Sequence, residues 1–116
     1  MHLINRQVAI IKPRKPYVDW INSLQGATGE PSSIESLKRD CTAVLMPEDL
    51  DTDEESLDYL KKIHKKIFDI ELHGWCTDKK FWPKKRDVSL FIEWFDCEFH
   101  SEIFDSLETD IEKEEY

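Results

Sequence analysis

Apolar residues recur with the spacing of a helix between positions 52 and 74. Four aliphatic residues in this stretch are separated by three, four and three positions: Leu60, Ile63, Ile67 and Ile70. Side chains at this spacing lie on one face of an α-helix, and an apolar face has to be covered by other elements. We therefore predict one long helix that packs this face against a sheet.

Both ends of this stretch carry residues that are typical of helix termini. Thr52 followed three positions later by Glu55 is a capping-box pattern, and further acidic residues lie where the helix dipole is positive. Gly74 is expected to adopt the left-handed conformation that often ends a helix. The predicted helix therefore spans residues 52–74.

Two short apolar runs, each followed by a proline, predict strands covered on both faces. They occupy residues 6–12, which we place at the centre of the sheet, and residues 41–46. Towards the end of the chain the period changes to two, and Asp96, Glu98, His100 and Glu102 alternate with Cys97, Phe99, Ser101 and Ile103. This alternation predicts an edge strand with one buried and one solvated face.

Shorter helices complete the expected order of elements. Pro16 begins a helix that Gly26 closes, Ser32 caps a short second helix, and Asp87 caps a third. The connections between the strands are long enough for either parallel or antiparallel neighbours.

The resulting fold class is α+β. We expect a single small domain over residues 1–105, with a three-stranded sheet, in which mixed pairing is allowed, packed against helices and one long central helix. Residues 106–116 form an acidic tail that is expected to be frayed or disordered.

Composition limits the class of protein. Apolar residues make up 40% of the 116 positions, which favours a folded chain over a disordered one. No apolar run is long enough to cross a bilayer, and the first residues lack the features of a signal peptide. The three cysteines are too few for a disulfide framework. We expect a cytoplasmic protein without a cofactor or a membrane partner.

The charge of the chain indicates what kind of partner suits it. The net charge is −9, and residues 87–116 alone carry eleven acids and one lysine. Such a field favours a basic partner and makes nucleic acid an unlikely one. Residues 79–86 combine five basic residues with Phe81 and Trp82, a pattern used to bind single strands. Flanked by acidic blocks, the two aromatic residues are more simply interpreted as part of the core.

The solvated face of the last strand is the leading candidate site. Asp96, Glu98, His100 and Glu102 could attract lysines or arginines of a partner, and a free strand edge offers backbone groups for pairing. The same residues could carry hydrolysis or hold a divalent cation. They could also serve only to keep strand edges from pairing with one another.

A metal site is the alternative that the cysteines and histidines suggest. His73 and Cys76 form one pair and Cys97 and His100 another, a separation typical of zinc ligands. Against this interpretation, Cys97 and His100 are three positions apart on a predicted strand and so face opposite sides.

The predicted long helix contains a further candidate pair. His64 and Glu71 lie within its apolar stripe, where burial would shift their pKa values. Seven residues of helix separate them by about 10 Å, so they cannot pair directly.

Three segments carry a resemblance to a known family. They are residues 15–24, the Gly74-Trp75-Cys76-Thr77-Asp78 stretch followed by Trp82-Pro83, and residues 93–101. On these the chain resembles a family of small uncharacterised bacterial proteins, over nearly the full domain without the acidic tail. The resemblance implies no activity, cofactor, partner or site residue.

Three functions are compatible with these patterns, and the third of them is that of a structural subunit in a larger assembly. The leading hypothesis is a non-enzymatic interaction domain whose acidic surface binds a basic protein. The alternative is a small hydrolase or metal-dependent enzyme that uses His100 with Glu98, Glu102 or Glu71.

Overall fold

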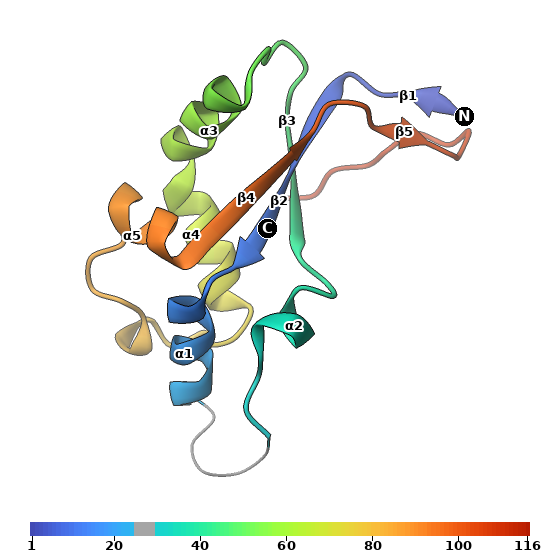
Figure 1. Cartoon of the computed structure of the whole chain (residues 1–116). Helices are drawn as coiled ribbons and strands as arrows, with labels where there is room; N and C mark the ends of the chain where they lie inside the picture. The colour runs from blue at the N-terminus through green and yellow to red at the C-terminus, as the bar shows by residue number, and fades with distance from the viewer. Residues whose placement is uncertain (25–29) are drawn as a thin grey trace.

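A computed structural model describes residues 1–24 and 30–116, and in these the chain forms an α+β fold with two antiparallel sheets. Helices lie on one side of a three-stranded sheet, and a short ribbon of two strands projects from its end (Figure 1). The elements are, in chain order, β1 (His2–Leu3), β2 (Arg6–Pro13), α1 (Lys15–Leu24), α2 (Ile34–Leu37), β3 (Thr42–Pro47), α3 (Asp53–Lys62), α4 (His64–His73), the 3₁₀ turn η1 (Lys79–Phe81), α5 (Val88–Trp94), β4 (Phe95–His100) and β5 (Phe104–Asp105).

The first long strand is central, as predicted. The sheet order is β3-β2-β4, and both neighbours of β2 run antiparallel to it. The sequence allows parallel as well as antiparallel neighbours, but the β2–β3 and β2–β4 pairs are both antiparallel. The last long strand, β4, lies at an edge of this sheet, which confirms that part of the prediction.

The inner face of β2 forms the floor of the core. Ala9 and Ile11 are fully or almost fully buried under the helices, whereas Ile10 and Lys12 on the other face are half-buried. Most of the largest fully buried side chains come from the helices, namely Ile21, Leu60, Phe68, Leu72 and Phe91, and β3 contributes Met46. The helices cover one face of the sheet, and no helix covers the other, which we call the open face although Val8 on it is 9% exposed. The predicted covering of both faces is wrong for β3, where Ala43 and Leu45 are exposed.

The predicted long helix is two helices. Leu60 and Ile67 are buried as the apolar stripe requires, but α3 ends at Lys62 and α4 begins at His64. Between them Ile63 has φ −111° and ψ 14°, outside the helical range.

A side chain explains the break. Nδ1 of His64 lies 2.6 Å from the backbone oxygen of Lys61, which in an uninterrupted helix would accept the amide of Lys65. The backbone amide of Ile63 bonds the oxygen of Leu60, three residues back, as in a 3₁₀ turn. The apolar stripe therefore continues across Ile63, whereas the series of helical hydrogen bonds between each amide and the carbonyl four residues earlier is interrupted there.

The predicted helix ends are right in part. Thr52 and Asp87 cap α3 and α5 through their side chains, while the short helix α2 is capped by Ser33 instead of Ser32. Gly74 is right-handed, with φ −61° and ψ −23°, so the left-handed conformation predicted for it is wrong. The chain continues from it in a tight turn, with the amide of Cys76 bonded to Leu72. The predicted closure at Gly26 lies outside the described residues.

After β4 the chain leaves the main sheet. β5 pairs with β1, placing Leu3 opposite Phe104 and His2 opposite Asp105. Residues 106–116 form no helix or strand, and their side chains are exposed. The tail runs back from the ribbon past β3 (Figure 1), and the ring of Tyr116 lies 6.1 Å from that of His73.

Ile67→Ala tests whether the apolar stripe of the two helices is core. Ile67 is 2% exposed, so the truncation leaves a cavity and should lower the free energy of unfolding by roughly 2–5 kcal/mol in urea denaturation. Lys65→Ala, at an exposed position of the same helix, should change it by no more than about 0.5 kcal/mol. Equal small losses for the two variants would contradict the packing described here.

Candidate functional site

The open face of the sheet gathers three of the four predicted acidic-strand residues. His100 lies opposite Val8, Glu98 opposite Ile10, and Asp96 opposite Lys12 across the β2–β4 pair. Because directly paired residues project to the same side, Asp96, Glu98 and His100 share one face, and all three are exposed. Glu102 follows the end of the strand and is exposed as well. The strand prediction is therefore right for Asp96, Glu98 and His100, and wrong for Glu102, which lies beyond the end of β4.

Two of the carboxylates already have partners on β2 and the turn that follows it. Nζ of Lys12 lies 3.4 Å from Oε1 of Glu98, and Nη2 of Arg14 lies 3.4 Å from Oδ1 of Asp96. Nε2 of His100 lies 2.8 Å from Oε2 of Glu98. The hydrogen bond from His100 and the pairing with Lys12 lower the pKa of Glu98. Such solvent-exposed pairs contribute little stability and exchange readily.

The outer edge of β4 is free among the described residues. β4 pairs only with β2 in this part of the chain, so the backbone N–H and C=O groups along its other side have no strand partner. An exposed edge of this kind can pair with an added strand, and the charges beside it restrict which strands approach.

The predicted metal ligands do not form a site. Among the described ranges, which include all four residues, no three His, Cys, Asp or Glu side chains come together in a way that could hold a metal ion. Cys97 points into the protein, where burial raises its pKa to about 11, while His100 lies on the opposite face with Glu98. His73 packs near Tyr116, and Sγ of Cys76 lies 3.5 Å from the oxygen of Asp78.

Glu71 lies at a different place from the acidic strand. It lines a small cavity of about 80 Å³ together with Tyr17, Cys41 and Thr42. The hydroxyl of Tyr17 donates to the backbone oxygen of Glu71 at 2.9 Å and lies 3.4 Å from Oε2. Oε1 is buried and has no hydrogen-bond partner among the described residues. Burial raises the pKa of Glu71, against the hydrogen bonds of Thr42 and Tyr17.

His64 and Glu71 do not act as a pair. Nδ1 of His64 contacts the backbone of Lys61, and its Nε2 is buried without a partner in the described part of the chain. Glu71 likewise lines a cavity that His100 does not, so the combination of His100 with Glu71 is absent from this arrangement.

Of the two aromatic residues in the basic segment 79–86, one is buried in the core and the other is exposed. Trp82 is 5% exposed and its Nε1 donates to the oxygen of Cys76 at 2.8 Å, as the core interpretation predicts. Arg86 lies over the same ring at 5.4 Å. Phe81 is 55% exposed, so it is not part of the core. Because Trp82 is buried, it is not free to stack on a nucleic-acid base.

One feature of the surface was not predicted. A hollow of about 370 Å³ lies between β3, the β1–β5 ribbon and the tail, and its apolar lining consists of Ile4, Leu45, Ile103, Phe104, Leu107 and Ile111. The available signal was the pair Leu107 and Ile111, four positions apart in an otherwise polar tail. That spacing alone does not indicate what the two side chains would contact.

Comparison with known proteins adds no family to this description. No protein-family model, no curated protein and no solved structure matches the chain significantly. In residues 1–24 and 30–116 none of the helices has the length and apolar character needed to span a membrane.

Glu71→Gln tests the buried carboxyl through the pH dependence of stability. The folded pKa of Glu71 lies above its ordinary value of 4.5, so the folded state holds the proton more tightly than the unfolded state. The free energy of unfolding contributed by this group is therefore full below the unfolded pKa and falls as the pH rises through the folded pKa. Thermal denaturation between about pH 4 and pH 8 should show this fall in the natural chain and a smaller one in the variant. Parallel curves would contradict the shift.

Proposed function

We propose that this protein is a non-enzymatic interaction domain that binds a basic protein through the acidic face of β4. The observation that supports it is the common orientation of Asp96, Glu98 and His100 on an exposed face of an edge strand. A row of carboxylates beside a free strand edge can bind lysine or arginine side chains and backbone groups at once.

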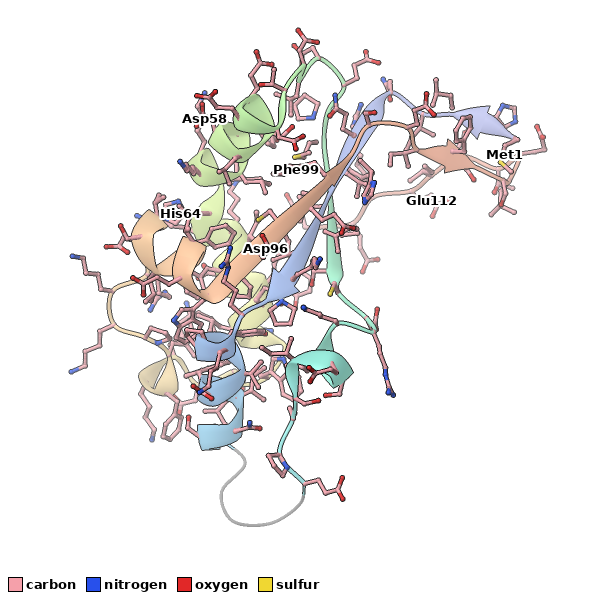
Figure 2. All side chains as sticks on the ribbon, in the orientation of Figure 1. Met1, Asp58, His64, Asp96, Phe99 and Glu112 are labelled. Carbon is pink, nitrogen blue, oxygen red and sulfur yellow. The ribbon has the colours of Figure 1, made fainter. Side chains whose placement is uncertain are left out.

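The distribution of charge supports the same conclusion. Residues 87–116, which carry eleven acids and one lysine, include β4, β5 and the tail. In Figure 2, Glu112 lies on the side of the strands where Met1 and the ribbon lie, whereas Asp58 and His64 lie on the side of the helices. A one-signed field over a surface accelerates encounter with a partner of opposite charge and weakens as salt is added.

The internal ion pairs are compatible with this function. Lys12 and Arg14 hold Glu98 and Asp96 only through exposed contacts of 3.4 Å. Since exposed pairs of this kind contribute little stability, a partner that brings several cations can replace them.

The enzymatic alternative has less support. His100 does contact a carboxylate, with 2.8 Å between its Nε2 and Oε2 of Glu98. Both side chains are half exposed, at 55% and 48%, so the contact between them is open to water and is not enclosed as in a typical catalytic pocket. An acid–base function of His100 stays a prediction.

Reversal of charge on the acidic face tests the proposal. Glu98→Lys with Glu102→Lys should abolish capture of a basic protein from an extract of the source cells, and capture by the natural chain should fall between about 50 mM and about 300 mM NaCl. The matched control is Asp58→Lys with Glu93→Lys, which makes the same change in net charge at exposed positions of α3 and α5. Circular dichroism would verify the fold of both variants.

The control variant should capture the same protein as the natural chain. Capture that is equal for both double variants and that ignores ionic strength would refute the acidic face as the binding surface.

A further inference from the structure

The hollow between β3, the ribbon and the tail lies on the same side of the sheet as the acidic strand. Val8 of β2 is paired directly with both Leu45 and His100, so these three side chains form one row across the open face. Neighbouring strands are about 4.8 Å apart, which puts Leu45 roughly 10 Å from His100. Because Leu45 lines the hollow, the hollow adjoins the acidic face.

The lining of the hollow is apolar and open to solvent. Leu45 is 46% exposed, Phe104 55%, Leu107 63% and Ile111 59%. Single exposed side chains of this kind are common on protein surfaces, but four that surround one hollow form a contiguous apolar patch. Patches of this type, bordered by polar residues, mark sites of interaction.

The charged residues that border the hollow are all acidic. Its charged lining residues are Asp105 and Asp110. Residues 101–112 as a whole contain five acids and no lysine or arginine, namely Glu102, Asp105, Glu108, Asp110 and Glu112. The one described ion pair in this segment joins Glu108 to His2 at 3.1 Å. The charge of the border therefore remains largely uncompensated.

We propose that the hollow receives aliphatic side chains from a basic amphipathic helix of the partner, whose lysines or arginines contact the acidic border and the face of β4. This inference rests on the proposed function and adds the part of the surface that supplies apolar contact. A volume of about 370 Å³ accommodates a few side chains from successive turns of a helix.

Charge decides between this occupant and a second copy of the chain. A symmetric dimer through the hollow would bring two acidic borders together, and like charges at close range oppose association. A helix with apolar residues on one face and cations beside them can contact the apolar lining and the acidic border at the same time. The hollow would then supply affinity, and the acids would supply orientation and a fast encounter.

Fluorescence anisotropy with a labelled synthetic peptide tests this site. The probe is an amphipathic helical peptide made of leucine and lysine, and a peptide of the same composition in scrambled order is its control. The natural chain should bind the helical peptide more tightly than the scrambled one. Leu107→Ser with Ile111→Ser should weaken binding at least about tenfold, because both substitutions remove apolar lining from the hollow.

The variants are chosen so that the fold stays intact. Leu107 and Ile111 are exposed in a segment without helix or strand. The matched control is Phe81→Ser with Ile92→Ser, two exposed apolar residues on η1 and α5, which should change binding by less than about twofold. Failure of the natural chain to bind, or equal binding by both double variants, would overturn the proposed site.

The outcomes separate this inference from the proposed function. If Glu98→Lys with Glu102→Lys abolishes binding but Leu107→Ser with Ile111→Ser does not, the acidic face is used and the hollow is not. Light scattering adds one further outcome, since a dimer of the natural chain that the Leu107→Ser, Ile111→Ser variant dissociates would assign the hollow to self-association and overturn the inference.

Discussion

The burial of Phe95 is the contact on which the rest of this structure depends. Phe95 is 2% exposed and lies at the junction of α5 and β4. Its ring centroid lies 4.7 Å from that of Tyr17, 5.5 Å from that of Phe68 and 5.4 Å from that of Phe91. These rings come from α1, α4 and α5, so one side chain joins three helices to the edge strand. Aromatic contacts of this kind add to the free energy gained by burying their area.

This anchor determines the orientation of every residue that follows it. Along a strand successive side chains alternate between faces, so fixing Phe95 inward turns Asp96, Glu98 and His100 outward. A shift of the strand register by one position would bury the charged side chains and expose Phe95 and Phe99. Burying unpaired charges costs a large amount of free energy, so this shift does not occur. The acidic face is thus a direct consequence of where the aromatic core holds the start of β4. The open face combines these charges with the apolar hollow beside Leu45, which lies two strands away in the same row.

The sequence was informative for the strands and for two of the helix N-caps. The apolar run of β2, the alternation of β4 and the capping residues Thr52 and Asp87 were predicted correctly, because each depends on residues close in the chain. The break at Ile63 was missed since it depends on the contact of His64 with the Lys61 oxygen, which leaves the apolar period unchanged. The β1–β5 ribbon was missed because strands of two residues have no period. Asp96, Glu98 and His100 lie on the exposed strand face as predicted, whereas the hollow depends on segments far apart in sequence.

Backbone amide NMR of the natural chain, titrated with the leucine–lysine helical peptide, tests the account most directly, because it locates binding without any substitution. Binding at the open face should concentrate the chemical-shift changes in β4 and in residues 101–111, with few in α3 and α4. Changes concentrated on α3, α4 or the basic segment 79–86 would contradict the open face as the binding surface.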